Sequence, residues 1–242
     1  MRYFFVICFL TLQLHARVLS LSDESFASFF SGEMSTSVVK TSPFSDLING
    51  SESYSSEYKN GYGGEFGFIY STPYVGWRFS FEFLKPSKLS GVEGSNTGAV
   101  NYLVASDITS VAPKVGIELH LSKKSNSRLY LFGFYGSANL TMINSYTQLT
   151  VSPNADYEAN FKASSSVYGG GLGWEWSFVD TTTLGLELGY RSLNFKEIKF
   201  SKDASTLQGS KVSGDLYQDY LGQNKSLNLS SSYLALAFRF WL

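Results

Sequence analysis

Residues 64–83, GEFGFIYSTPYVGWRFSFEF, decide the fold class of this 242-residue chain. After Pro73 the residues alternate strictly, because Val75, Trp77, Phe79, Phe81 and Phe83 share one phase and Gly76, Arg78, Ser80 and Glu82 share the other. Successive side chains of a strand point to opposite faces, so this segment is expected to be a β-strand with one strongly apolar wall. The other wall carries charges among glycine and serine. Such a strand is typical of a membrane β-barrel, with lipid outside and a polar lumen inside.

The composition is compatible with a single barrel domain. Aromatic residues make up 17% of the chain and charged residues 16%, and the formal net charge is -1. No run of about 18 apolar residues is present, so a membrane-spanning helix is not expected. The balanced charge and the lack of a basic cluster give no reason to expect a nucleic-acid partner.

The first 20 residues differ from the rest of the chain. Arg2 supplies a short positive start, residues 3–12 form an apolar run, and Ser20 ends a small-residue site for cleavage. We interpret residues 1–20 as a cleavable signal peptide and residues 21–242 as the barrel domain. A buried core strand or helix is the alternative for the apolar run. Because Cys8 is the chain's one cysteine, the exported protein would have no disulfide.

A period of two residues predicts eight strands along the remaining chain. They are residues 26–39, 62–70, 74–84, 114–121, 129–140, 166–179, 183–195 and 227–242. Three connections are short, at 71–73, 122–127 and 180–182, whereas 40–60, 85–113, 141–164 and 196–226 are predicted to be long loops. Short turns at one end and long loops at the other are typical of an eight-stranded antiparallel up-and-down transmembrane β-barrel. In the fifth strand we expect Tyr130, Phe132 and Phe134 to face outward.

The lysines support a membrane barrel over a soluble one. Most of them fall in predicted loops, turns or strand ends, whereas a soluble sandwich would spread lysines along its solvated face. A soluble lipocalin-like barrel, with its aromatic residues inside, is the alternative architecture.

The chain resembles the small eight-stranded bacterial outer-membrane proteins, the group that includes the OmpA membrane domain and OmpX-like proteins. Besides the strand count and loop alternation, the resemblance rests on the C-terminal strand YLALAFRFWL, which contains Phe238, Phe240, Trp241 and Leu242. It implies that the barrel assembly machinery reads this strand, although such proteins usually end in an aromatic residue and this chain ends in Leu242. It also implies a monomer in the outer membrane of a Gram-negative bacterium, in contact with membrane lipid and lipopolysaccharide.

The lumen-facing phase collects charges of both signs. The acids are Glu33, Glu65, Glu82, Glu118, Glu175 and Glu187, and the bases are Arg78, Arg191 and Arg239. A buried unpaired charge is costly, so these groups are expected to be paired or hydrated. If Tyr70 faces Pro73, Glu65 lies opposite Arg78, which is our first predicted pair. Glu187 and Arg239 form the second.

These charges have two interpretations. They are either an ion-pair plug or gate, or groups that solvate and specify a filled barrel interior. We favour the filled interior, because eight strands leave room only for side chains.

We expect a structural or surface-interaction role through the long loops. A channel for small or hydrophobic solutes is the alternative. A third possibility is a lipid A-modifying enzyme that uses His120 with a serine and Glu118. His120 is predicted beside a short turn at the periplasmic end, far from outer-leaflet lipid A, so we do not expect an enzyme.

Cofactor, metal and ligand sites are not expected either. The exported chain would hold one histidine and no cysteine, which leaves little to bind a metal. Trp77, Trp174, Trp176 and Trp241 are predicted to face outward in interfacial girdles, not to stack on ligands.

Overall fold

The computed structural model describes residues 20–21, 23–37, 44, 53–54, 60–96, 99–150 and 155–242. The predicted signal peptide, apart from Ser20, and most of the predicted loop 40–60 lie outside the described residues. Eight strands form a ring: β1 (Phe26–Ser37), β3 (Gly61–Ser71), β4 (Val75–Pro86), β6 (Ala99–Lys123), β7 (Ser127–Thr147), β8 (Tyr157–Val179), β9 (Thr182–Phe195) and β14 (Ser231–Trp241). Within these described residues, no helix is long and apolar enough to cross a membrane.

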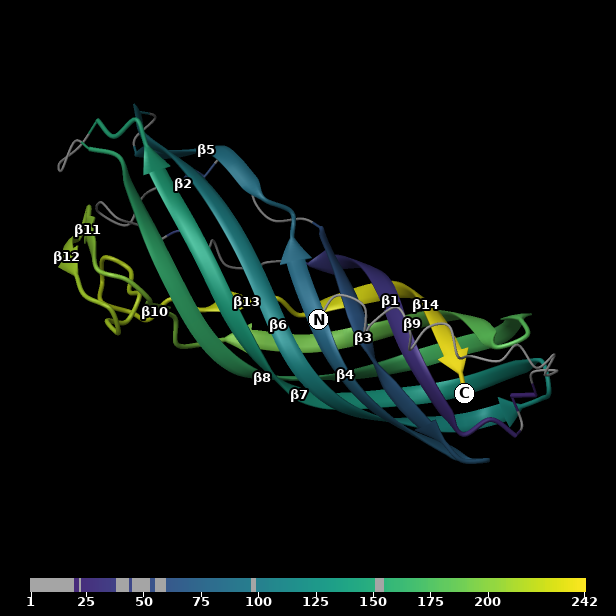
Figure 1. Ribbon diagram of the computed structural model, residues 1–242. Coiled ribbons are helices and arrows are strands. Elements are labelled where there is room, and N and C mark those ends of the chain that lie inside the picture. Colours follow the sequence, from purple (N-terminus) through teal and green to yellow (C-terminus); the bar gives the residue numbers. More distant parts are fainter. Residues whose placement is uncertain are drawn as a thin grey trace, which may run out of the picture.

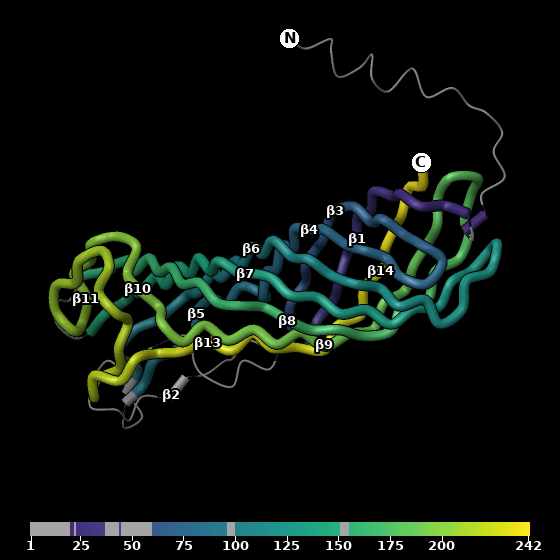
Figure 2. The backbone as a smooth tube through the Cα atoms, turned by 90° about the horizontal axis from the view of Figure 1, so that it is seen from below, coloured from purple at the N-terminus to yellow at the C-terminus, as the bar shows by residue number. Residues whose placement is uncertain are grey.

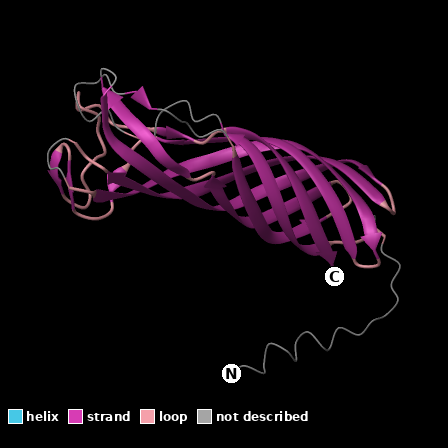
Figure 3. Ribbon diagram, turned by 90° about the horizontal axis from the view of Figure 1, so that it is seen from above, coloured by secondary structure: helices cyan, strands magenta, loops and turns pink. Residues whose placement is uncertain are grey.

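The ring is a closed meander. Each of these strands pairs antiparallel with the next one in the chain, and β14 pairs with β1 to close the ring (Figures 1 and 3). Closure leaves no unpaired edge in the ring, so its backbone groups are satisfied without water. The predicted eight-stranded antiparallel up-and-down transmembrane barrel is confirmed.

The opening sequence stretch folds into the β3–β4 hairpin, but in a different register from the predicted one. Tyr70 faces Trp77, not Pro73, and Glu65 faces Glu82. The turn closes at Thr72, whose backbone N–H donates to the Val75 carbonyl at 2.7 Å. The predicted and observed registers differ by an even number of residues, and such a slip leaves every side chain on its own face. Face alternation therefore could not distinguish them.

Two predicted long loops, 85–113 and 141–164, are largely strand. β6, β7 and β8 contain 25, 21 and 23 residues, whereas β1 and β14 contain 12 and 11. Short strands accompany these long ones: β2 (Ser53–Tyr54), β5 (Leu89–Asn96), β10 (Lys199–Phe200), β11 (Ala204–Thr206), β12 (Gly209–Lys211) and β13 (Leu227–Asn228). We call residues 87–110, 138–165 and 193–229 the extension. Figure 2 shows β10 and β11 at the end of the molecule opposite the C-terminus.

The extension has an apolar interior of its own. On β6, Tyr102, Val104 and Ile108 point inward and are buried, whereas further along the strand the inward positions are Lys114 and Glu118. The outward positions change in the opposite sense, from Asp107 and Thr109 to valine, isoleucine and leucine. The loop prediction failed here because the polar face of this part of the strand is outside, not inside.

Two predicted orientations are wrong. In β7, Tyr130 and Phe132 are buried in the lumen and Phe134 packs against them, while Leu131 and Tyr135 face outward. Both phases of this segment are apolar, so alternation alone did not identify the lipid side. Trp241 also points inward and is 3% exposed, so it is not part of an outer girdle.

Candidate functional site: a chain of ion pairs in the lumen

The lumen contains six glutamates and five basic side chains in contact with one another. They include every lumen residue predicted from the sequence, and they add two bases. The set is Glu33, Glu65, Glu82, Glu118, Glu175 and Glu187 with Arg78, Lys114, Arg128, Arg191 and Arg239. All five bases and all of the glutamates except Glu65 are buried, and the Glu65 side chain is 11% exposed. Their contacts run along the lumen from the short-turn end toward the extension.

At the short-turn end, Arg239 and Arg128 bind the same carboxylates. Arg239 donates hydrogen bonds from both terminal nitrogens to the two oxygens of Glu118, at 2.8 and 3.1 Å. It also lies 3.0 Å from Glu175, which Arg128 contacts at 2.5 Å. Paired guanidinium–carboxylate contacts of this kind are stronger and more directional than neutral hydrogen bonds.

Glu187 links this end to the middle of the lumen. Its Oε1 atom accepts from Arg78 at 2.9 Å and from the Tyr130 hydroxyl at 2.8 Å, and it lies 3.2 Å from Arg239 Nη2. The predicted Glu187–Arg239 pair is therefore formed. Arg78 Nε also lies 3.2 Å from Glu65, so that predicted pair exists although its supposed register does not. Strand tilt, not direct opposition, brings Glu65 and Arg78 together.

Toward the extension, Lys114 and Arg191 share Glu82. Lys114 Nζ lies 2.8 Å from both Glu65 and Glu82, and Arg191 Nη1 lies 2.8 Å from both Glu82 and Glu33. Each cation therefore bridges two carboxylates, which offsets the cost of taking these charges out of water.

Lys114 and Arg128 were missed from the sequence. Lys114 lay at the very start of a predicted strand, although it shares the inward phase of Glu118. Arg128 adjoined a predicted turn, and the wrong phase for β7 placed it on the lipid side. If Tyr130 had been assigned to the lumen, Arg128 would have been predicted there too, because the two residues share one phase of β7.

Little space remains around Glu65 and Arg78 in the lumen. The cavity that Glu65, Arg78, Ser80, Gly116, Phe132, Gly133, Phe134 and Tyr233 line has a volume of about 10 Å³. That is at most room for a single water molecule. Aromatic rings complete the filling, because Arg239 lies over Tyr130 at 4.8 Å and Arg78 over Phe29 at 4.4 Å.

His120 lies at the short-turn end, and its contacts are not those of a general base that activates a serine nucleophile. Its Nδ1 atom lies 3.3 Å from the Pro73 carbonyl oxygen, and Nε2 lies 3.2 Å from Arg128. Ser71 accepts a bond from Arg128 at 3.0 Å and does not pair with His120. Across the part of the chain that the structure describes, no group of three or more His, Cys, Asp or Glu side chains could hold a metal ion.

The C-terminal strand has one lipid-facing and one lumen-facing row. Phe240 and Leu242 are exposed, and Phe238 in the same row is half-buried and stacks on Phe30 at 5.1 Å. Trp241 belongs to the inner row, where its indole N–H donates to Glu175 at 3.2 Å and to Thr183 at 3.1 Å. The end of β14 is therefore tied into the ion-pair chain.

Comparison with known proteins extends only to the fold. No protein-family model matches the chain, and no curated protein sequence matches it. A major outer membrane protein from Thermus thermophilus has a TM-score of 0.50 at 12% identity, with 89% of this chain and 99% of that one covered. OprG from Pseudomonas aeruginosa gives 0.49 at 12% identity (94% and 98% covered), and Ail, the attachment invasion locus protein of Yersinia pestis, gives 0.47 at 12% (90% and 99%). The likeness to the Thermus thermophilus protein, together with the closed ring of eight antiparallel strands, shows that the chain has the fold of a small bacterial outer-membrane β-barrel.

Proposed function

We propose that this protein is an outer-membrane barrel with a closed lumen, and that it acts structurally or in surface interaction through its extension. The main support is the chain of ion pairs across the lumen, with a cavity of only about 10 Å³ beside Glu65 and Arg78. A filled interior leaves the wall and the extension as the surfaces available for function. The extension's apolar core supports a folded platform, since 24 buried side chains of the described residues pack in it and next to it.

The proposed orientation places the extension outside the cell. The turns between β3 and β4, β6 and β7, and β8 and β9 are short, and short turns face the periplasm in such barrels. The exported chain would contain no cysteine, so single cysteines report location cleanly. On intact cells, an impermeant maleimide is expected to label Ser210→Cys in the extension. Asn126→Cys, in a short turn, should react only after the outer membrane is permeabilised. The reverse labelling pattern would contradict this orientation.

Planar-bilayer recording separates a closed barrel from a channel. The purified protein is expected to give no steady discrete conductance steps. The matched variant is Glu82→Ala, which removes a carboxylate that two cations share, and it should raise leakage above that of the wild type. A steady wild-type conductance would overturn the closed-lumen proposal in favour of the small-solute channel.

We further propose a monomer that contacts membrane lipid and lipopolysaccharide and that the barrel assembly machinery inserts through β14. We propose no enzymatic role, because His120 lies at the short-turn end and does not pair with Ser71. Comparison of lipid A acylation with and without the gene tests this point. A change that depends on His120 would restore the enzyme hypothesis.

A further inference from the structure

The outer wall of the barrel carries three neighbouring hollows over β4, β6, β7, β8 and β9. The first is apolar, with a volume of about 410 Å³, and is lined by Trp77, Phe79, Val115, Gly116, Ile117, Gly133, Phe134 and Tyr135. The second, of about 400 Å³, shares Val115 and Tyr135 with it. The third, of about 570 Å³, shares Ser166 with the second. A single extended molecule could therefore contact all three.

The apolar hollow lies where Gly133 leaves the outward row of β7 without a side chain. Gly133 and Gly170 are opposite each other on β7 and β8, both in the outward phase. Around them the wall is bulky, because Tyr135 and Tyr168 are 60% and 55% exposed. Gly133 lines the hollow and Gly170 does not, so the missing side chain of Gly133 leaves the gap in this otherwise aromatic surface.

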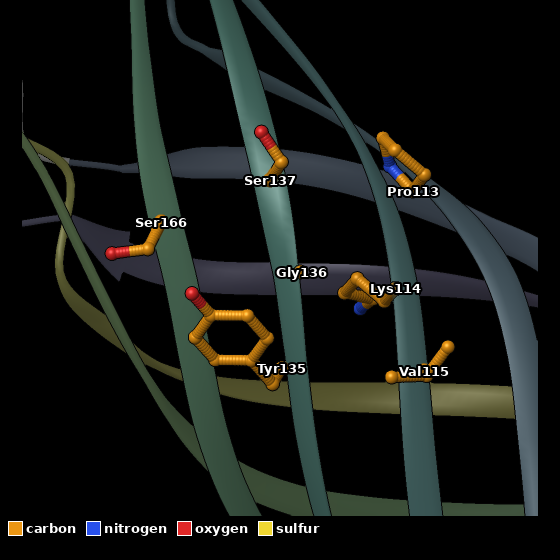
Figure 4. A pocket seen from close by; sticks show the side chains of 7 residues that line it. All are labelled: Pro113, Lys114, Val115, Tyr135, Gly136, Ser137 and Ser166. Carbon is orange, nitrogen blue, oxygen red and sulfur yellow. The ribbon is translucent and has the colours of Figure 1, made fainter.

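The second hollow lies where the apolar band ends. Figure 4 shows Pro113, Lys114 and Val115 on one strand, Tyr135, Gly136 and Ser137 on the next, and Ser166 on a third. Ala112 and Pro113 have no partners in the β6–β7 register, and proline has no N–H to continue a ladder. Serine replaces aromatic side chains above this level, so the hollow spans the boundary between hydrocarbon and water.

The third hollow is polar and lies beside unpaired positive charge. Ser164, Ser165, Ser166, Ser192 and Asn194 supply hydroxyl and amide groups, and Lys196 and Glu197 complete its rim with Tyr168. Just beyond Ser164, Lys162 pairs directly with Lys199 across β8 and β10, and both are exposed. Like charges directly opposite each other are destabilising. Lys162, Lys196 and Lys199 have no ion-pair partner in the described parts of the chain.

We propose that these hollows are a binding site for one phosphorylated glycolipid of the outer leaflet, lipopolysaccharide. The proposal rests on the outer-membrane location proposed above. An acyl chain lies in the gap at Gly133, sugar hydroxyls bond the serines and Asn194, and phosphate lies between Lys162 and Lys199. Phosphate there relieves the repulsion between the two lysines. Both the sugar-binding groups and the cations favour this ligand over an ordinary phospholipid.

The test measures binding to the folded, full-length exported protein in detergent by native mass spectrometry. Purified lipopolysaccharide is compared with phosphatidylglycerol, which is anionic but has no sugar. Replacing Lys162, Lys196 and Lys199 together by Gln is expected to weaken lipopolysaccharide binding at least tenfold, since each lysine near an anionic lipid surface contributes a factor of about five. The control is Lys88→Gln. Lys88 is exposed and directly precedes β5, which pairs with β6, whereas the three lysines lie on or near β8 and β9. This variant should leave binding unchanged.

A second variant tests the apolar hollow. Gly133→Leu should fill the gap and weaken binding at least fivefold, because a Cβ at Gly133 would have its nearest atom at 3.7 Å and the strand can accept it. The control is Gly32→Leu, at an outward glycine of β1 where a Cβ would meet nothing within 4 Å.

Three results would overturn this site. They are equal affinity for phosphatidylglycerol, no effect of the lysine variant, and equal effects of Gly133→Leu and Gly32→Leu. The cysteine-labelling experiment is independent, so a protein correctly placed in the outer membrane that fails these binding tests refutes the site alone.

Discussion

Replacement of Arg239 by Met tests whether the lumen charges act as a connected, dry network. Arg239 is fully buried and lies within 3.2 Å of Glu118, Glu175 and Glu187, and it donates to Tyr130 at 2.6 Å. Removal of one partner from a buried ion pair costs about 3–5 kcal/mol. Each of the three glutamates keeps another cation, Arg128 or Arg78, within 3.7 Å. We therefore expect a loss near the lower end, about 3 kcal/mol.

Urea unfolding in detergent micelles, followed by heat-modifiable gel migration, measures this loss. The half-buried pair Lys85–Asp107 is the matched control, with its atoms 3.4 Å apart and its side chains 32% and 34% exposed. Lys85→Met should cost less than about 1 kcal/mol. The double variant Arg239→Met with Glu118→Gln should lose less than the sum of the two single losses, because it removes opposite charges together. A loss for Arg239→Met no larger than the Lys85 control, or strict additivity, would mean that water solvates these charges.

Three further changes have defined outcomes in the same unfolding assay or in limited proteolysis. Gly173→Ala should cost about 1–3 kcal/mol, because its Cβ would lie 2.2 Å from the Tyr130 ring, whereas Gly32→Ala should be neutral. Trp241→Phe removes the donor to Glu175 and Thr183 and should cost about 1–3 kcal/mol; a loss as small as that for the lipid-facing Trp174→Phe would show that this donor contributes nothing. Phe161→Ala removes a ring 4.3 Å from Tyr217, so it should make the extension sensitive to protease while the barrel keeps its heat-modifiable migration. Simultaneous loss of both properties would mean that the extension and barrel unfold as one unit.

The barrel itself could be predicted from the sequence because alternation is a local signal. The alternation of Trp77, Phe79 and Phe81 assigns them to the lipid-facing side without information about any neighbouring strand. Register is different, because Glu65 stays in the lumen whether it faces Arg78 or Glu82. Only the turn at Thr72 and the tilt of the whole ring decide which partners meet.

The strands of the extension could not be predicted from the sequence for a related reason. Its strands alternate as well, but Tyr102 and Val104 are inside and Asp107 is outside, which reverses the chemistry expected of a membrane strand. The phase of β7 was ambiguous because Leu131 and Phe132 are both apolar. Knowledge of Arg128 as a lumen residue would have resolved it, since Arg128 and Tyr130 share one face.

The reversal of polarity along β6, β7 and β8 has a consequence for immersion depth. Outward side chains recur every two residues, about 6.6 Å along a strand and about 5 Å along the membrane normal at the usual tilt. Sinking the barrel by one such step would carry Thr109, Ser137 and Ser166 into hydrocarbon. Raising it by one step would expose Val111 and Tyr135 to water. The protein therefore has one favoured height, and a bilayer of different thickness must deform around it.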